Sequence, residues 1–431
     1  MKVCVQGLWH LGSVTAACLA DAGIPTVGLD DQEPVIAELS RGVPPLFEPG
    51  LAELTRRGLD SGTLSFTTDI QKAVGDADVV WVAFDTPVDE EDRADTDFVI
   101  RHVEALFPSL KDGAIVLVSA QLPVGSTAEL ERRFKRQHPR RRVTFAYSPE
   151  NLRLGKAIEV FTRSERIVIG ARDEDTRRAL RPLLERFCPN LIWVSVESAE
   201  MVKHALNAFL ATCVTFTNEV ATLCERVGAD ADEVEKALRS EPRVGQKAYV
   251  RAGPAFAGGT LARDVVFLGG LARTHRVAVP LLDSILPSNG EHRRWALRQV
   301  EARLGAPEGK TVAVLGLAYK PGTDAIRRSV AIELCRGLAG LKVRVRAFDP
   351  KVTRLPPDLS ATVELAPTMA EAIGGADAVI IATEWPEFRD ASADEFARRM
   401  RNPLVIDQNR FLPPGFSTHG GIRYVTIGKP A

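Results

Sequence analysis

Short apolar runs alternate with amphipathic stretches along the first 195 residues of the chain. Continuous apolar strands separated by helices are typical of a parallel sheet that helices cover on both faces. The pattern therefore predicts a doubly wound α/β domain. Its predicted strands are KVCVQG (2–7), TVGLD (26–30), DVVWVAF (78–84), AIVLVS (114–119), VTFAYS (143–148), RIVIG (166–170) and LIWVSV (191–196).

A different periodicity follows in residues 198–228. Apolar residues recur there at i, i+3 and i+4 over roughly eight turns, which predicts one long helix. A helix of this length suits a spine between domains or a contact in a dimer. The next stretch, 243–264, is irregular and rich in glycine, and helical patterns then continue to about residue 303.

From Lys310 the alternation of strand and helix begins again, and an acid, Asp349, ends the second predicted strand of this part. The fold class is thus α/β, with two Rossmann-like doubly wound domains joined by the long helix and a small helical domain. The predicted domains are 1–195, 196–303 and 304–431. The predicted strands of the last domain lie in TVAVLGLAYK (311–320), KVRVRAFDP (342–350), ADAVIIAT (376–383) and PLVIDQN (403–409).

Composition excludes several classes of protein. The formal net charge is −1, so no strong field favours nucleic acid or an anionic membrane, and no apolar run approaches membrane-spanning length. The six cysteines form no C-x-x-C pair and no regular spacing. We therefore expect a reduced, cytoplasmic protein without a metal site.

The stretch GLWHLG (7–12) joins the first predicted strand to a helix. In a dinucleotide-binding turn the first glycine permits the tight bend and the last lets helix and strand pack closely, and Gly7 and Gly12 keep these roles. Trp9 replaces the middle glycine, which normally lets the backbone approach a pyrophosphate. Asp30 ends the second strand and suits the ribose hydroxyls of NAD, while no arginine follows closely, which disfavours NADP. We expect NAD to be bound, with its pyrophosphate accommodated around Trp9.

Further segments occur in one order along nearly the whole chain. Together they resemble the nucleotide-sugar 6-dehydrogenases, the family of UDP-glucose and UDP-N-acetyl-mannosamine dehydrogenases. The segments are FEPGL (47–51), FDTPVDEEDRADTDFV (84–99), LPVGST (122–127), YSPENLRLGKA (147–157), ERIVIG (165–170), AEMVKHALNAFLAT (199–212), AFAGGTLARD (255–264) and GLAYKPGTDAIRRS (316–329).

The resemblance implies a specific reaction. These enzymes oxidise the C6 alcohol of a nucleotide-linked sugar to a carboxylate and pass two hydrides to two NAD. A cysteine adds to the intermediate aldehyde, and the resulting thiohemiacetal loses the second hydride to give a thioester, which water hydrolyses.

Roles carry over one motif at a time. Glu150 matches a glutamate implicated in proton handling, and Lys203 matches a lysine near the C6 oxygen, where it stabilises negative charge. Asn207 lies one helical turn after Lys203 and can donate a hydrogen bond to that oxygen. Asp264 matches an aspartate that cooperates with the lysine. Taken alone, a lysine on a long helix is usually solvated and an aspartate after a glycine-rich loop is usually a helix cap.

Other matches concern binding. Arg243 matches an arginine that in relatives reaches the sugar nucleotide across a subunit interface, which implies a homodimer, and Arg410 lies one position out of register with a family arginine. The candidate substrate-binding residues are Asn151, Leu152, Lys203, Asn207, Arg243, Tyr249, Lys320 and Arg410. The candidate cofactor-binding residues are Gly7, Trp9, Leu11, Gly12, Asp30, Thr86, Pro87 and Gln121.

The chain departs from the family in the reacting pocket. The alignment places Thr260 at the position of the nucleophilic cysteine and Arg263 at that of a lysine. Gln121 replaces a threonine, and Leu154 replaces a second glutamate. Cys213 lies ten residues past Lys203 and is interpreted as a packing residue.

Two classes of function follow. The first is an NAD-dependent oxidoreductase with altered chemistry, because a threonine hydroxyl is much less acidic than a thiol and needs a dedicated base. It would stop at the aldehyde, oxidise the aldehyde hydrate directly, or oxidise and re-reduce the sugar as an epimerase or isomerase. The second is a catalytically silent binder of sugar nucleotides.

Overall fold

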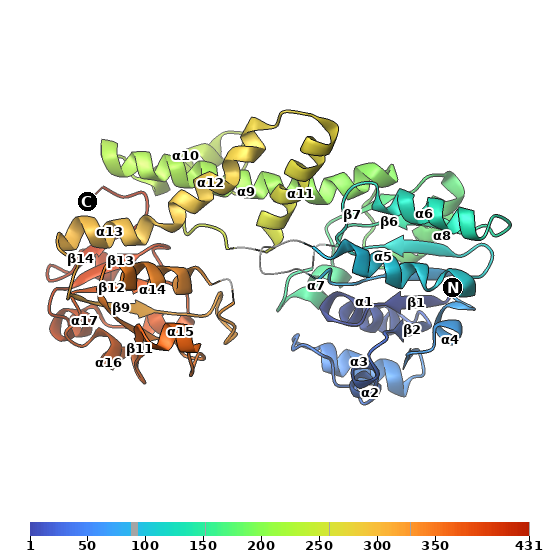
Figure 1. The fold of residues 1–431 in the computed structure, drawn as a ribbon, viewed down its shortest axis with the longest axis horizontal. Coiled ribbons are helices and arrows are strands. Elements are labelled where there is room, and N and C mark those ends of the chain that lie inside the picture. The colour runs from blue at the N-terminus through green and yellow to red at the C-terminus, as the bar shows by residue number, and fades with distance from the viewer. Residues whose placement is uncertain (88–93, 151, 258, 328, 431) are drawn as a thin grey trace. The chain divides into compact units, whose positions relative to one another are not determined.

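The computed structural model describes residues 1–87, 94–150, 152–257, 259–327 and 329–430. Its internal contacts divide the chain into two compact units, Met1–Leu206 and Asn207–Ala431. The division falls within helix α9 (Val196–Val227). The length of α9 confirms the long helix predicted from the apolar periodicity. Figure 1 shows the fold coloured along the chain and labels helices and strands of both units.

The first unit contains a sheet of strand order β3-β2-β1-β4-β5-β6-β7-β8. Neighbouring strands are parallel except β6 and β7, which pair antiparallel through Tyr147 and Gly170. The reversal at this pair departs from the fully parallel sheet expected from the sequence. The strands are β1 (Val3–Gln6), β2 (Thr26–Leu29), β3 (Leu64–Thr67), β4 (Val79–Val82), β5 (Ile115–Val118), β6 (Thr144–Tyr147), β7 (Ile167–Gly170) and β8 (Leu191–Val194).

Helices pack on both faces of this sheet, since successive side chains of each strand enter different cores. In β1, Val3 and Val5 belong to one buried cluster and Cys4 to another. The helices of the unit are α1 (His10–Asp21), α2 (Glu33–Ser40), α3 (Leu51–Asp60), α4 (Ile70–Val74), α5 (Thr96–Glu104), η1 (Phe107–Ser109), α6 (Ser126–Gln137), α7 (Ala157–Thr162) and α8 (Glu174–Leu184).

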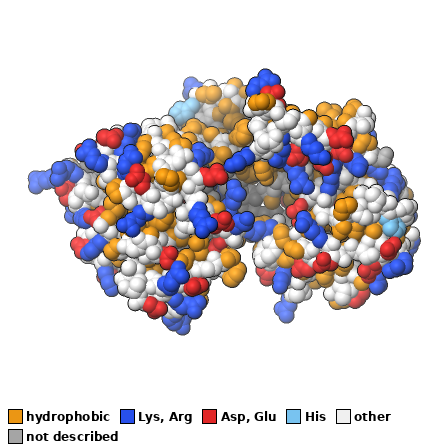
Figure 2. All heavy atoms as spheres, turned by 180° about the vertical axis from the view of Figure 1, so that it is seen from behind, with side chains coloured by type: hydrophobic (Ala, Val, Ile, Leu, Met, Phe, Trp, Pro, Cys, Tyr) orange, Lys and Arg blue, Asp and Glu red, His pale blue; other side chains and the backbone are white. Residues whose placement is uncertain are grey.

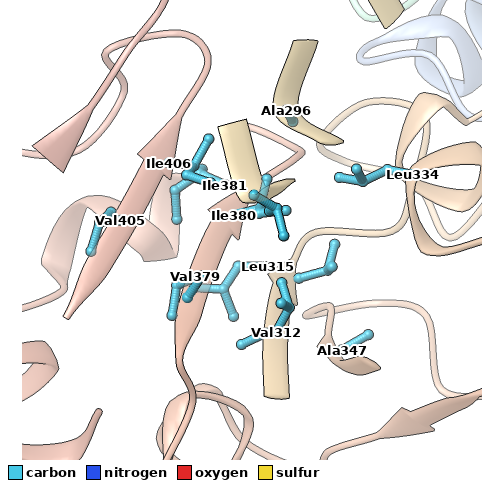
Figure 3. Close-up of a cluster of buried hydrophobic side chains, with 14 of the residues drawn as sticks. Ala296, Val312, Leu315, Leu334, Ala347, Val379, Ile380, Ile381, Val405 and Ile406 are labelled. Atoms are coloured by element: carbon cyan, nitrogen blue, oxygen red, sulfur yellow. The ribbon is translucent and has the colours of Figure 1, made fainter. Parts of the chain in front are cut away.

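The second unit contains a parallel sheet of strand order β11-β10-β9-β12-β13-β14. Figure 3 shows Val312, Val379 and Val405, three of the side chains that form its core. The strands are β9 (Thr311–Leu315), β10 (Arg344–Phe348), β11 (Val363–Leu365), β12 (Ala378–Ile381), β13 (Leu404–Asp407) and β14 (Arg423–Val425).

Some helices of the second unit pack against one another, and others pack against the sheet. A buried cluster that includes Ala208, Val265 and Ile285 joins α9, α11 and α12. The helices are α10 (Ala231–Ser240), α11 (Thr260–His275), α12 (Pro280–Arg293), α13 (Trp295–Leu304), α14 (Val330–Gly340), α15 (Pro357–Ser360), α16 (Met369–Ile373), η2 (Pro386–Asp390), α17 (Ala393–Arg399) and α18 (Gly415–Thr418).

The surface carries charged side chains of both signs together with exposed apolar ones. Figure 2 shows basic and acidic side chains interspersed on the visible face, in keeping with the net charge of −1. Within the described residues, no helix combines the length and the apolar character needed to cross a membrane.

Candidate functional site

The turn after β1 requires glycine at both ends. Gly7 has a φ of 87°, and a Cβ placed there would lie 2.5 Å from the ring of Phe84. A Cβ on Gly12 would lie 1.7 Å from the carbonyl oxygen of Gly7. Trp9 precedes α1 as its N-cap and is 50% exposed, so its indole is not part of the core. The turn therefore keeps the tight bend and close helix packing of a dinucleotide-binding turn.

Asp30 lies at the carboxyl end of β2, beside this turn. Its carboxylate accepts hydrogen bonds from the backbone N–H of Leu8 at 2.8 Å and of Gln32 at 3.1 Å. Burial raises the pKa of the Asp30 carboxyl, although both backbone donors oppose that rise. Neighbouring Asp31 pairs with His102 Nε2 at 3.1 Å.

An open cavity of about 310 Å³ lies next to Asp30. Its size lies at the lower end of the range for small-molecule pockets, and its lining combines apolar side chains with polar and charged ones. Among the described residues, the buried Gln6 Oε1 at its wall has no hydrogen-bond partner. The adenosine half of a dinucleotide fits these features. The lining residues are Gln6, Leu29, Asp30, Asp31, Thr68, Ile70, Phe84, Arg101, His102 and Ala105.

The segment after β4 lies against the same turn. Asp85 Oδ2 accepts a hydrogen bond from the backbone N–H of Leu11 at 3.1 Å. The Thr86 hydroxyl donates to the carbonyl oxygen of Gln121 at 2.8 Å, and both residues are buried. Pro87 directly precedes residues 88–93, which lie outside the described residues. Thr86 and Gln121, separated by 35 residues, are thus brought together.

The structure also brings Lys203 and Glu150 together. Lys203 Nζ donates to the carbonyl oxygen of Glu150 at 2.7 Å and to its Oε1 at 3.1 Å, and Lys203 is buried. Glu150 Oε2 accepts from the backbone N–H of Leu152 at 2.9 Å. An ammonium and a carboxylate in contact can stabilise negative charge and exchange a proton. The predicted substrate residue Asn151 lies outside the described residues.

Asn207 and Asp264 form a second buried pair. The Asn207 side-chain amide donates to Asp264 Oδ2, and Asp264 is fully buried in α11. Thr260 is the first residue of α11 and is exposed. Asp264 therefore lies one helical turn after Thr260, with its carboxylate already engaged by Asn207.

The cysteines offer no exposed thiol. All six are in described residues; five are buried and Cys213 is partly buried. Burial raises the pKa of Cys213 and raises that of Cys18 to about 12. A thiol reacts as its thiolate, so these side chains are poor nucleophiles near neutral pH.

The loop at 249–257 borders a second open cavity, of about 360 Å³. Asn289 makes two hydrogen bonds to the backbone of Phe256, donating at 2.9 Å and accepting at 3.0 Å. Asn218 Oδ1 accepts from the N–H of Gly253, and His292 Nε2 lies 2.9 Å from the Gly253 carbonyl oxygen. These three buried side chains fix the loop. The cavity is lined by Val214, Tyr249, Arg251, Ala252, Gly253, Pro254, Ala255, Phe256, Leu261, Glu384 and Asn409.

Sequence reasoning did not identify these loop-holding residues, nor Glu48. The buried Glu48 carboxylate accepts from the N–H groups of Gly155 and Ala157 at 2.8 Å each and lies 3.0 Å from His10 Nε2. No signal in the sequence singled out Asn218 or Asn289, because both stand among other polar residues. Only the fold reveals which backbone each side chain reaches.

The remaining predicted binding residues lie in the second unit. Arg243 is highly exposed and pairs with Glu241 at 2.8 Å, and Lys320 Nζ lies 5.5 Å from the centre of the Tyr319 ring. Arg410 has a φ of 51°. Its guanidinium pairs with Asp230 at 2.9 Å and with Asp232. These two carboxylates give Arg410 a structural anchor, and its role toward substrate remains a prediction.

Together, the doubly wound sheet, the glycine-bounded turn and the acid at the end of β2 define a dinucleotide-binding protein. Comparison with known proteins makes this class specific. Residues 1–188 match the NAD-binding domain of the UDP-glucose/GDP-mannose dehydrogenase family, residues 197–291 its central domain and residues 313–414 its UDP-binding domain. The chain belongs to this family of NAD-dependent nucleotide-sugar dehydrogenases. The predicted boundaries at 195 and 303 remain a prediction.

Similar proteins cover the whole chain. A UDP-glucose 6-dehydrogenase of Rhizobium meliloti (strain 1021) is 36% identical over 100% of both chains. One from Pseudomonas aeruginosa is 33% identical over 100% of this chain and 98% of its own. A solved UDP-glucose dehydrogenase from the archaeon Pyrobaculum islandicum has a TM-score of 0.86 at 29% identity, covering 100% of this chain and 98% of that one.

Proposed function

We propose that the protein oxidises the C6 alcohol of a UDP-glucose-like nucleotide sugar with NAD and releases the aldehyde after one hydride transfer. The observation that carries this proposal is the exposed Thr260 at the position of the family's nucleophilic cysteine, in a chain whose six cysteines are all at least partly buried. The similarity to UDP-glucose 6-dehydrogenases supports the substrate class.

In the proposed oxidation, the C6–H bond breaks and its electron pair leaves as hydride, for which NAD supplies the acceptor. The Glu150 carboxylate takes up the hydroxyl proton, and the Lys203 ammonium beside it stabilises the developing negative charge on the C6 oxygen. Burial of the lysine strengthens that interaction, because little water screens it. Asn207, one turn along α9, orients the same oxygen.

A second oxidation requires an adduct on the aldehyde carbon. A thiolate forms one readily, whereas a threonine hydroxyl needs a base to remove its proton. The carboxylate one turn along α11 belongs to Asp264, which is fully buried and accepts the amide of Asn207. We infer that Thr260 is not activated and that the aldehyde is the product.

The test is the stoichiometry of the reaction. Purified protein is mixed with NAD and a panel of UDP-, GDP- and TDP-sugars, while NADH absorbance and product mass are followed. One NADH per sugar and an aldehyde product are expected. Two NADH per sugar and a carboxylate would contradict the proposal and favour direct oxidation of the aldehyde hydrate.

Thr260→Cys sharpens the test. A thiol at this position supplies the missing nucleophile, so the yield of NADH per sugar should rise from about one toward about two, with carboxylate as product. Thr274→Cys, in the last turn of the same helix and also exposed, is the matched control and should leave the stoichiometry unchanged. An unchanged product in Thr260→Cys would exclude Thr260 as the residue that sets the outcome.

A silent binder of sugar nucleotides is the second candidate. It is favoured by Trp9 and by the Asp85 carboxylate on the N–H of Leu11, both of which lie where a dinucleotide approaches. No NADH with any sugar, together with thermal stabilisation by a UDP-sugar, would support it.

We also propose that the protein forms a homodimer through α9. Exposed apolar side chains follow a heptad spacing along this helix, at Phe209, Phe216 and Leu223, and Val227 continues the pattern. Such a seam normally faces another helix. Leu223→Lys should halve the mass measured by sedimentation, whereas Arg226→Lys, on the same turn, should not; a monomeric parent protein would refute the proposal.

A further inference from the structure

The first turn of α1 already holds an anion. A helix N-terminus presents unpaired N–H groups and a partial positive charge, and in doubly wound domains the dinucleotide pyrophosphate binds there. α1 begins at His10, directly after the turn, and its Leu11 N–H donates to Asp85 Oδ2 at 3.1 Å. The carboxylate comes from the segment that follows β4, 74 residues away in sequence.

Asp85 has the same electrostatic relation to α1 as a phosphate group. Both are oxyanions that accept a backbone N–H, and both are stabilised by the positive end of the helix. They cannot use the Leu11 N–H at once, and two negative groups at one helix end repel each other. Trp9 replaces the middle glycine of the turn. Its side chain further hinders the close approach of the pyrophosphate to the backbone.

The adenosine half of the cofactor site shows no such conflict. The cavity beside Asp30 is open, and its apolar residues, Leu29, Ile70 and Phe84, leave room for a base. The conflict is therefore confined to the phosphates. This separation makes it measurable, because ligands with and without phosphate share the adenosine pocket.

We propose that Asp85 is an internal competitor of the cofactor's pyrophosphate and sets the affinity for NAD. Binding requires the carboxylate to leave the Leu11 N–H, so part of the interaction free energy of the phosphates is spent on displacing it. The proposal concerns cofactor binding and needs no sugar, so it stands or fails independently of the chemistry proposed at Thr260.

Asp85→Asn is the decisive variant. It keeps an oxygen that can accept the Leu11 N–H and removes the charge. Titration calorimetry without sugar should show that NAD and ADP-ribose bind to Asp85→Asn about tenfold more tightly than they bind to the parent protein. The affinity for adenosine should not change, because adenosine carries no phosphate.

Controls separate this effect from a general loss of negative charge. Asp21→Asn removes an acid at the other end of α1 and should leave all three affinities unchanged. Thermal unfolding of both variants checks the fold. The gain for ADP-ribose should also shrink as salt is raised, since screening weakens the repulsion.

Several results would overturn the proposal. An equal gain for adenosine would place the effect outside the phosphates, and no gain, or a loss, for ADP-ribose in a folded variant would show that Asp85 does not compete. Tightening of NAD binding by Mg²⁺ in the parent protein but not in Asp85→Asn would indicate that the carboxylate bridges to the phosphates through a cation instead.

Discussion

The two sheets of the molecule begin with the same turn, built twice. Gly7 after β1 and Gly316 after β9 both have a positive φ, of 87° and 92°. A Cβ on either glycine would lie 2.5 Å from a side chain that follows the neighbouring strand, Phe84 in one sheet and Thr383 in the other. In each sheet the acid that ends the second strand accepts the N–H of the leucine after the glycine.

The acids differ in how many donors surround them. Burial disfavours ionisation of Asp349, but backbone N–H groups from Ala318, Leu317, Lys351 and Val352 outweigh it and hold the pKa of Asp349 below its ordinary range. Its Oδ2 also accepts the indole N–H of Trp385 at 3.0 Å. Fewer donors reach Asp30, and its pKa is raised.

This difference shows what an acid at the end of a second strand means. Asp349 has its oxygens committed to the protein, so it serves as a structural anchor for the turn. Asp30 accepts two backbone N–H groups and borders an open cavity, so its carboxylate retains lone pairs for ribose hydroxyls. The sequence position alone does not distinguish the two roles.

The largest effect is expected from adding a methyl group to the turn of the second sheet. In Gly316→Ala the new Cβ would meet both the side chain and the backbone nitrogen of Thr383, at 2.5 and 2.7 Å. The backbone cannot move away easily, so the free energy of unfolding of the second unit should fall by about 3–4 kcal/mol. In Gly7→Ala the nearest atoms all belong to a side chain, that of Phe84, and the loss in the free energy of unfolding should be about 2 kcal/mol.

Hydrogen exchange of peptides over β9 and β1 measures each unit separately. Gly340→Ala, in α14 with open space around the glycine, is the control and should be neutral or slightly stabilising. Equal losses in the two turns would mean that Phe84 is held as rigidly as Thr383.

The second prediction concerns the two acids. Asp349→Asn places an amide NH₂ among the donors that surround this position and should cost about 2–3 kcal/mol near neutral pH. Because folding lowers the pKa of Asp349, its ionisation stabilises the fold above the ordinary value of 3.8, and this contribution is lost as the pH falls through the folded pKa.

The contribution of Asp30 to stability changes with pH in the opposite direction. Folding raises its pKa, so its contribution is present below 3.8 and is lost as the pH rises through the folded pKa. Asp30→Asn should therefore cost little stability near neutral pH but weaken NAD binding about tenfold. Calorimetric unfolding of both variants between about pH 3 and about pH 7 tests the signs; parallel pH profiles would refute the contrast.

Sequence patterns anticipated the parts of the fold that repeat over many residues. The long apolar periodicity predicted α9, and continuous apolar runs predicted the central strands of both sheets. They missed β3, β11 and β14, each of which is an edge strand; β11 and β14 have only three residues each. An edge strand buries only part of its surface, so its sequence carries a weak apolar signal.

The candidate site was predictable where the local backbone conformation or the local hydrogen-bond donors require one particular type of residue. A glycine is required at Gly7 by its φ, and an acid at Asp30 by the donors around it. The contact between Asp85 and Leu11 was not predictable, because it joins residues 74 apart through the order of strands in the sheet. The same holds for Trp385, whose partner is 36 residues away.

The smallest effect is expected from two indole N–H groups, one in each unit. Trp385 Nε1 donates to the Asp349 carboxylate, whereas Trp81 Nε1 donates to the Ser119 hydroxyl at 2.9 Å. Hydrogen bonds to a charged acceptor contribute about twice as much as those to a neutral one. Trp385→Phe should therefore cost about 1 kcal/mol more than Trp81→Phe, since both lose similar packing area.

Urea unfolding of the two variants, followed by hydrogen exchange in each sheet, measures the difference. The charge on Asp349 also predicts that the difference in lost stability between Trp385→Phe and Trp81→Phe becomes smaller in acid, because that carboxylate becomes protonated. If the two variants lose equal stability at all pH values, the charge on Asp349 contributes nothing through Trp385. The contrast between the two turns would then rest on the backbone donors alone.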